Sequence, residues 1–253
     1  MRIVVITQDE PFFLADSINF LISNLPKKHK IVGFVVADVS PFGKKESFLT
    51  KAMKTFNIFG ARFFLRYTFK FILNKIFKPS VIQEINSHKL NLIKLDSSIN
   101  SKESLEKLKN LNPDLLISIA GNEIFKKDLI NLAPRGCLNV HTALLPKYRG
   151  LMPTFWVLKN NEEFTGVSVF FVDEGIDSGP IIVQKKIKIG NITQEDLIKK
   201  TKKIGMDAII EAVELIENNN VNTIDNNDEE MTYFKFPEKE DVKEFHRIGK
   251  RFF

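Results

Sequence analysis

The stretch Leu115-Leu116-Ile117-Ser118-Ile119 is continuously apolar apart from one serine. A run of this kind is expected of a central parallel strand, because helices bury such a strand on both faces. Other apolar runs of strand length lie at 2–7, 31–37 and 90–95. Segments with helical periodicity lie between the first two runs and between the last two. This β-α-β alternation predicts an α/β protein with a mostly parallel, twisted sheet flanked by helices.

Further elements are expected downstream of this strand. In chain order they are a fifth strand at 137–141, a short helix at 153–159, two strands at 165–172 and 181–189 joined by a loop over 174–179, and a helix from 193 to about 218. Segment 218–228 is rich in Asn and Asp and is predicted to be a loop. The aromatic and charged tail after it is expected to pack back on the body or on a partner.

Composition sets the broad class of the protein. Its 253 residues, 43% of them hydrophobic, can bury a substantial core. The single cysteine, Cys137, excludes an intramolecular disulfide, and no Cys/His cluster has zinc-site spacing, so we expect a cytoplasmic protein. The N-terminal apolar run stops at Gln8 and is predicted to be a strand and not a signal. The net charge of +6 favours anionic partners without selecting one.

Segment 48–78 is unusual because aromatic and basic residues alternate in it without any acidic residue. A helix of this composition fits peripheral contact with an anionic membrane surface. It equally fits a helix packed on the sheet or on a second subunit, with lysine and arginine head groups reaching solvent. The apolar positions go nearly all round the helix, which favours the packed alternative, including a homodimer contact. The chain has no apolar run long enough to span a membrane.

Asn139 and His141 lie two positions apart at the end of the predicted fifth strand. Side chains at this spacing emerge on the same face of a strand, so both are expected to point into one pocket, beyond the carboxyl edge of the sheet. An asparagine amide can stabilise a carbonyl oxygen as it becomes an oxyanion. Histidine can exchange a proton near neutral pH. Together these side chains suit acyl transfer.

A carboxylate beside the histidine would fix its tautomer. Asp177 is the best candidate, because it lies in the turn-forming segment Gly175-Ile176-Asp177-Ser178-Gly179 that can bring it to the strand end. Asp173 and Glu174 are nearby competitors. Each of these residues alone has an ordinary structural explanation as a turn former or a polar contact.

The combined motifs carry a family resemblance. The segments Asn139-Val140-His141, Leu144-Leu145-Pro146-Lys147-Tyr148-Arg149-Gly150, Thr165-Gly166-Val167-Ser168 and Asp173 to Gly179 resemble the formyltransferase superfamily that uses 10-formyltetrahydrofolate. This superfamily includes glycinamide ribonucleotide transformylase, methionyl-tRNA formyltransferase and sugar N-formyltransferases. The match is dense from about 114 to 184 and weaker before it. It implies a Rossmann-like formyltransferase fold, with a catalytic domain over 1–217 and a linker and C-terminal extension over 218–253.

The resemblance implies roles for individual residues. Asn139 and His141 would stabilise the tetrahedral oxyanion formed when an amine attacks the formyl carbon, and Asp177 would orient charged His141. The folate co-substrate would bind a cleft lined by Ala120, Gly121, Asn122, Leu144, Asp173, Glu174 and Gly175. No metal is implied.

The acceptor amine is predicted by elimination. Methionyl-tRNA formyltransferases carry a barrel-like C-terminal domain, and glycinamide ribonucleotide enzymes have a glycine-rich first turn, whereas this sequence shows neither. The chain therefore looks most similar to sugar N-formyltransferases, which act on amino sugars linked to a nucleotide or lipid carrier. The residues expected to contact that acceptor are Gln8, Asp9, Glu10, Lys147, Tyr148 and Arg149.

Two alternatives remain open at this point. One keeps the same three side chains but formylates another amine, such as an aminoacylated tRNA; the amino-sugar hypothesis expects no nucleic acid partner. The other treats the basic segment 48–78 as the functional element on a non-catalytic, membrane-associated scaffold.

Overall fold

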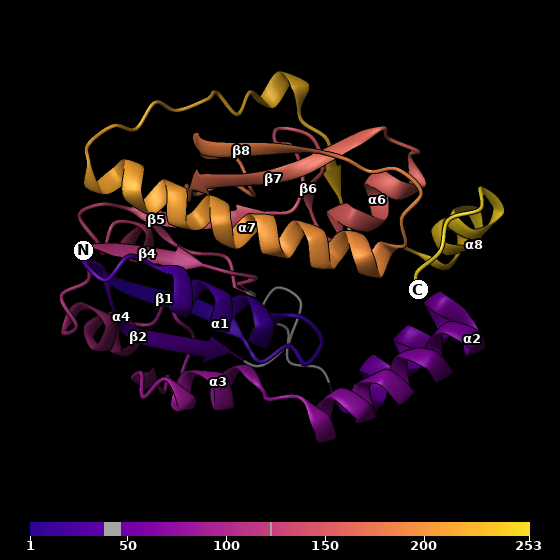
Figure 1. Cartoon of the computed structure of the whole chain (residues 1–253), viewed down its shortest axis with the longest axis horizontal. Helices are drawn as coiled ribbons and strands as arrows, with labels where there is room; N and C mark the ends of the chain where they lie inside the picture. Colours follow the sequence, from indigo (N-terminus) through magenta and orange to yellow (C-terminus); the bar gives the residue numbers. More distant parts are fainter. Residues whose placement is uncertain (38–46, 122) are drawn as a thin grey trace.

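The computed structural model describes residues 1–37, 47–121 and 123–253, which form three layers with a sheet between helices (Figure 1). The strand order is β3-β2-β1-β4-β5-β7-β8. Its strands are β1 (Arg2–Gln8), β2 (Lys30–Ala37), β3 (Leu92–Ile93), β4 (Leu115–Ser118), β5 (Cys137–His141), β7 (Phe164–Phe171) and β8 (Ile181–Lys188). The first five are parallel, and β7 runs antiparallel to β5 and β8. The predicted α/β class is confirmed.

Helices cover both faces of the sheet. They are α1 (Leu14–Asn24), α2 (Phe48–Phe77), α3 (Val81–Ser87), α4 (Lys102–Lys109), α5 (Lys127–Ile130), α6 (Pro153–Lys159), α7 (Gln194–Glu217) and α8 (Lys239–Arg247). A short pair, β6 (Arg149–Gly150) and β9 (Tyr233–Phe234), forms a second sheet. A turn of 3-10 helix at Asp228–Glu230 precedes β9.

Side chains of the central strands point alternately to the two faces of the sheet, and each face carries its own apolar cluster. Ile3 and Val5 of β1 pack with α1, α3 and α7 on one face of the sheet. Val4 and Ile6 face the other way and pack with α4 and α5. Because successive side chains of a strand point to opposite faces, a continuous apolar run is what a doubly covered strand requires.

The predicted elements and the observed ones agree closely in the middle of the chain. β5 and α6 have the predicted bounds, and Thr193 caps α7 by accepting a hydrogen bond from the Asp196 amide. The strand expected over 90–95 is shorter, because β3 lies at the edge of the sheet and pairs only at Leu92 and Ile93.

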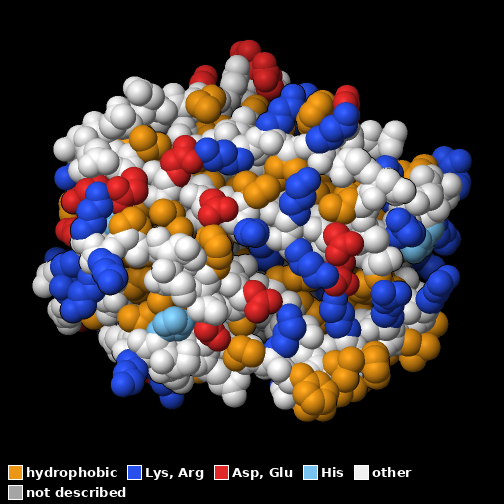
Figure 2. Space-filling model, in the orientation of Figure 1, with side chains coloured by type: hydrophobic (Ala, Val, Ile, Leu, Met, Phe, Trp, Pro, Cys, Tyr) orange, Lys and Arg blue, Asp and Glu red, His pale blue; other side chains and the backbone are white. Residues whose placement is uncertain are grey.

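Helix α2 lies along one edge of the molecule, next to α8 (Figure 1). It bends at Gly60, whose φ of 80° and ψ of 170° lie outside the helical region. Figure 2 shows apolar side chains gathered along the lower right edge of the molecule, where Figure 1 places this helix. Among the described residues no helix is long and apolar enough to cross a membrane.

The C-terminal segment packs back on the body, which was one of the two predicted outcomes. Phe245 of α8 and Phe252 are buried with Phe155 of α6 in a separate aromatic cluster. The Trp156 indole donates a hydrogen bond to the Lys235 carbonyl oxygen at 3.1 Å. Residues after α7 therefore complete the core around α6.

Candidate active site

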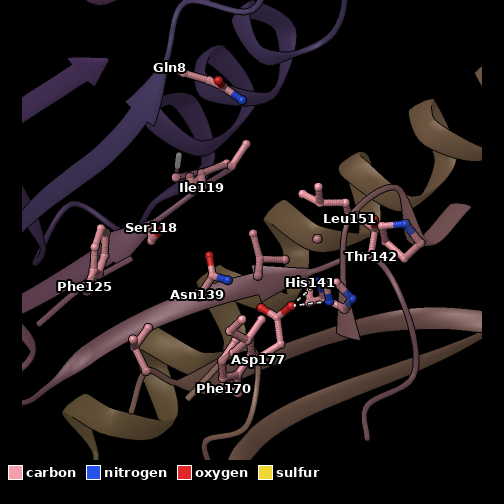
Figure 3. A pocket seen from close by; sticks show the side chains of 18 of the residues that line it. Gln8, Ser118, Ile119, Phe125, Asn139, His141, Thr142, Leu151, Phe170 and Asp177 are labelled. Carbon is pink, nitrogen blue, oxygen red and sulfur yellow. Dashed lines mark hydrogen bonds and ion pairs between the residues drawn. The ribbon is translucent and has the colours of Figure 1, made fainter. Parts of the chain in front are cut away.

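A cavity of about 360 Å³ lies beyond the carboxyl edge of the sheet. Its walls come from the ends of β1, β4 and β5, the turn after β4, the loop over 173–177 and one side of α7. Parallel strands bring their carboxyl ends to one edge, which explains why residues far apart in sequence meet here. Figure 3 shows Asn139, Asp177 and His141 side by side, with Gln8 and Ile119 across the cavity.

Asn139 and His141 project from β5 into this cavity, as their spacing predicts. Val140 between them packs against Gly205 of α7 and the core. Asn139 is partly exposed, and its amide has no hydrogen-bond partner within the described part of the chain. It is therefore available to a ligand.

The His141 ring is buried and held at both nitrogens. Nε2 lies 2.6 Å from the Tyr148 carbonyl oxygen, which can only accept, so Nε2 carries a proton. Nδ1 lies 3.5 Å from Oδ2 of Asp177. These two contacts set the orientation of the ring beside Asn139.

Asp177 has a left-handed backbone conformation with φ of 50°, which is uncommon outside glycine. Its Oδ2 also accepts a hydrogen bond from the Gly150 amide at 2.9 Å. Two residues later the loop backbone passes so close to Phe171 that only glycine fits at position 179, because a Cβ atom there would overlap the Phe171 carbonyl oxygen. The loop geometry, set by a glycine requirement, thus delivers the carboxylate to His141.

Asn226 holds this loop from the C-terminal segment. Its buried side-chain amide donates to the carbonyl oxygens of Asp177 at 2.8 Å and Gly179 at 2.9 Å. Asn226 lies in the segment predicted to be a loop, and nothing in that polar run distinguishes this buried asparagine from its exposed neighbours.

The residues predicted to bind folate are partly brought together. Ala120, Gly121, Asp173 and Gly175 line the cavity. Asp173 also stabilises its own turn, because Oδ1 accepts from the Gly175 amide at 3.0 Å and from the Ser178 hydroxyl at 2.6 Å. Asn122 lies outside the described residues.

Two other predicted folate residues do not line this cavity. The Leu144 side chain fills the space above Gly166, where a Cβ atom would overlap it. Glu174 is exposed and is not among the residues that line the cavity.

Among the predicted acceptor contacts at the end of β1, only Gln8 lines the cavity. The Asp9 carboxylate accepts a hydrogen bond from the Val81 amide at the start of α3. The Glu10 carboxylate accepts from the amides of Phe12 and Phe13 at the start of α1. Both acids cap helix N-termini, where unpaired amides and the helix dipole favour a negative charge.

The prediction that Lys147, Tyr148 and Arg149 contact the acceptor is also wrong for this cavity, because none of these three residues lines it. Lys147 is exposed. The Tyr148 hydroxyl donates to Glu162 at 2.6 Å, and burial together with this carboxylate raises the pKa of Tyr148 to about 12. The Arg149 guanidinium is buried and forms an ion pair with Asp228 at 2.6 Å. The Arg149 ion pair and a hydrogen bond from the Tyr148 amide to the Thr232 hydroxyl hold the loop against the C-terminal segment.

Lys202 of α7 lines the cavity, although sequence reasoning did not select it. It is partly exposed, and burial lowers the pKa of its ammonium group while Glu10 partly offsets this effect. A partly desolvated cation of this kind can recognise an anionic group on a ligand. Lys202 lies next to buried Thr201 and three positions before buried Gly205 on α7. The helical pattern alone does not predict that a lysine at this position faces a cavity.

The arrangement combines a neutral amide donor, a buried imidazole and a carboxylate around one cavity. Such a set can stabilise the oxyanion of an acyl-transfer intermediate and move a proton nearby. Within the ranges that the structure describes, no group of three or more His, Cys, Asp or Glu side chains could hold a metal ion.

Comparison with known proteins gives a family match over most of the chain. A family model described as formyl transferase matches residues 1–213. Methionyl-tRNA formyltransferase from Clostridioides difficile (strain 630) is 41% identical over 133 residues, which are 52% of this chain and 43% of that protein. The corresponding enzyme from Kosmotoga olearia is 38% identical over 146 residues, 57% of this chain and 47% of the relative. The chain thus spans less than half the length of these curated relatives.

Solved structures share the fold over a longer part of the chain. An N-formyltransferase from Helicobacter canadensis, in complex with folinic acid and dTDP-3-aminofucose, matches 92% of this chain and 70% of its own, with a TM-score of 0.57 and 18% identity. Glycinamide ribonucleotide transformylase 1 from Symbiobacterium toebii matches 89% of this chain and 94% of its own, with a TM-score of 0.63 and 17% identity. At these identities the likeness shows the fold alone.

Proposed function

This chain belongs to the formyl transferase family, and from that premise we propose that it is an N-formyltransferase. It transfers a formyl group from 10-formyltetrahydrofolate to the amine of an amino sugar carried by a nucleotide. The observation that carries the formyl transfer is the convergence of Asn139, His141 and Asp177 on one cavity, with 3.5 Å between the His141 ring and the Asp177 carboxylate.

The reaction follows from what each side chain can offer. The acceptor amine attacks the formyl carbon, and the carbonyl electron pair moves to its oxygen. The Asn139 amide donates to that oxygen as negative charge develops, and losing such a donor costs about 3 kcal/mol of barrier. The bond from the formyl carbon to the folate nitrogen then breaks, while that nitrogen takes up a proton and the amine loses one.

Asp177 and His141 act as a pair beside the reacting carbon. The carboxylate orients the ring, so that the imidazole lies at short range from the developing oxyanion. Asp177 also lies where the proton lost by the amine can be accepted, directly or through a water molecule. Holding the donor and the acceptor in one cavity supplies a further part of the acceleration through proximity.

Two observations support the nucleotide-linked amino sugar as acceptor. Lys202 places a cation on the cavity wall, where a diphosphate would be recognised, and Gln8 offers an uncharged amide for sugar hydroxyl groups. The neighbour from Helicobacter canadensis, solved with a nucleotide-linked amino sugar, matches the fold over 92% of the chain. The folate side of the cavity would use the backbone of Ala120, Gly121 and Asp173.

A direct assay tests this proposal. The purified chain is incubated with 10-formyltetrahydrofolate and a panel of nucleotide-linked amino sugars, and tetrahydrofolate and the formamide product are quantified together. We expect equimolar amounts of both products, and a loss of about a hundredfold or more in kcat for Asn139→Ala. Glu174→Gln, at an exposed side chain that does not line the cavity, is the matched control and is expected to retain full activity. Folate turnover without a formamide would contradict the proposal.

A second acceptor is favoured by a different observation. The curated relatives that match this chain at 38–41% identity are methionyl-tRNA formyltransferases. If this chain acts on the same acceptor, methionyl-tRNA rather than a sugar nucleotide will be formylated. The KM for methionyl-tRNA will then rise steeply with salt concentration, because contacts to nucleic acid phosphates release counterions and such binding weakens as salt is added. Competition between the two acceptors in one reaction decides between them.

A further inference from the structure

The second half of α2, after the bend at Gly60, exposes large apolar side chains along one stripe. The exposed fractions are 68% for Leu65, 64% for Phe69, 49% for Ile72, 36% for Leu73 and 66% for Ile76. Steps of three and four residues put all five on one side of a helix. We call this stripe the α2 outer face. Figure 2 shows it as apolar surface at the edge of the molecule.

The opposite side of the same helix packs against the body of the protein. Phe63 and Tyr67 lie there and stack on each other with ring centroids 5.6 Å apart. Phe63 contacts Phe252 and Tyr67 contacts Phe12. A helix that lies on a protein surface normally turns a polar side outward. The α2 outer face is therefore not needed for the core, and a contiguous exposed apolar surface of this kind indicates an interaction site.

Charge identifies the chemistry of the partner. The segment from 47 to 83 contains seven lysine and arginine residues and no acidic residue. Arg62, Arg66 and Lys75 are exposed on the same half of the helix as the apolar stripe. Lys70 and Lys78 are paired with Glu195 and Asp16 on the body. The apolar stripe therefore has cations beside it, and the helix itself carries no acidic side chain.

We propose that the α2 outer face docks on the surface of a lipid bilayer that carries anionic head groups. The apolar stripe enters the boundary between head groups and acyl chains, and the neighbouring arginine and lysine side chains contact lipid phosphates. The helix lies in the plane of the interface, in keeping with the finding that no described helix could span a membrane. This proposal does not depend on which amine the protein formylates.

The same observations disfavour other partners. Two copies joined through this face would bring two strongly basic segments together, and like charges oppose such contacts. A nucleic acid would match the charge but would leave the five aliphatic and aromatic side chains without an apolar environment. A bilayer with anionic lipid offers an apolar environment to the stripe and negative charge to the neighbouring cations.

Co-sedimentation of the full chain with vesicles tests the proposal. Vesicles of phosphatidylcholine alone are compared with vesicles that contain phosphatidylglycerol. We expect binding only to the anionic vesicles, reduced but not abolished by salt. The variant L65S/F69S/I76S is expected to partition about tenfold or more weakly, because each lost side chain removes apolar area from the lipid boundary.

A matched control replaces apolar side chains that are equally exposed elsewhere. Ile224 and Met231 are 50% and 45% exposed and lie on either side of the 3-10 turn at Asp228–Glu230 in the sequence. The segment that follows α7 runs along the edge of the molecule opposite α2 (Figure 1). The variant I224S/M231S should bind anionic vesicles as the original chain does. Absence of binding to anionic vesicles, or equal binding by L65S/F69S/I76S, overturns the proposal. A dimer in sedimentation velocity without lipid that L65S/F69S/I76S dissociates would instead assign the face to a second copy.

Discussion

The Asn226 side chain donates to the backbone carbonyl oxygen of Asp177 at 2.8 Å, although the two residues are 49 positions apart in the chain. This hydrogen bond ties the segment after α7 to the loop that carries the carboxylate facing His141. The left-handed backbone at Asp177 costs about 1 kcal/mol, so the surrounding contacts must hold it. Asn226 holds the backbone of this residue from outside the loop, and the Gly150 amide holds its carboxylate.

Replacing Asn226 with alanine should therefore impair catalysis from a distance. Asn226→Ala leaves the carbonyl oxygens of Asp177 and Gly179 without this donor, and we expect kcat to fall about tenfold or more. Stability should fall by about 1–3 kcal/mol, because buried acceptors lose their partner. Steady-state kinetics and thermal unfolding measure both effects. Asn227→Ala, at an exposed neighbour whose side chain caps the 3-10 turn, is the control and should leave kcat unchanged.

Asp177→Asn separates the charge of this residue from its backbone conformation. Asparagine tolerates a positive φ and can still accept from the Gly150 amide, so the folded structure should persist. The ring of His141 would then face a neutral group, and we expect kcat to fall by about a thousandfold. Circular dichroism checks the fold. Activity close to that of the original chain would remove Asp177 from the reaction.

Lys202→Met should raise the KM of an anionic acceptor by about tenfold to a hundredfold, the usual value of a charge-assisted hydrogen bond. Lys203→Met, exposed on the same helix, is the control and should not change KM. A KM unaffected by Lys202→Met would place the anionic part of the acceptor elsewhere.

The lowered pKa of Lys202 also makes a prediction about pH and stability. The folded pKa lies below the ordinary value of 10.5, so the unfolded chain binds more protons between the two values. This group therefore destabilises the folded protein at low pH, and its contribution improves as pH rises toward 10.5. Lys202→Met should raise the free energy of unfolding at pH 7 and flatten this pH dependence, which chemical denaturation at several pH values measures.

Removing the Phe252 ring should destabilise the whole protein. Phe252 is buried and stacks on Phe245 with ring centroids 4.7 Å apart, so Phe252→Ala leaves a cavity beside α6. We expect a loss of about 3–5 kcal/mol in the free energy of unfolding. Phe236→Ala is the control, because Phe236 is 42% exposed. A stable Phe252→Ala protein would mean that the C-terminal segment is dispensable for the core.

Cys137 should be inert toward thiol reagents in the native state. Burial raises the pKa of its thiol to about 12 from 9.0, so it stays protonated at pH 8, and the side chain is inaccessible. The unfolded thiol ionises near pH 9.0, which means that this group lowers stability as pH rises above 9. A thiol titration before and after denaturation tests the first statement. Rapid labelling of native protein would contradict it.

Much of the fold could be predicted from local pattern. The apolar run at 115–119 needs two covered faces, and the structure provides them through separate clusters on either side of β4. The two-residue spacing of Asn139 and His141 places both side chains at the cavity because a strand alternates its faces. These features depend only on neighbours in the chain.

The acidic residues at 9 and 10 show where local pattern fails. Their place at the end of β1 predicts a ligand contact, yet both carboxylates satisfy unpaired amides at the starts of α3 and α1. Arg149 likewise reads as a phosphate contact, but its guanidinium pairs with Asp228. A sequence shows which groups need partners and does not show which partner lies within reach.

The covered parallel sheet and the pairing of an amide with an imidazole at one strand end follow from local pattern, because periodicity and residue chemistry are local properties. Three other features follow from the packing of distant segments: Asn226 holds the Asp177 loop, Lys202 faces the cavity, and α2 turns an apolar stripe outward. These depend on which distant segments pack together, and packing is settled by the whole chain.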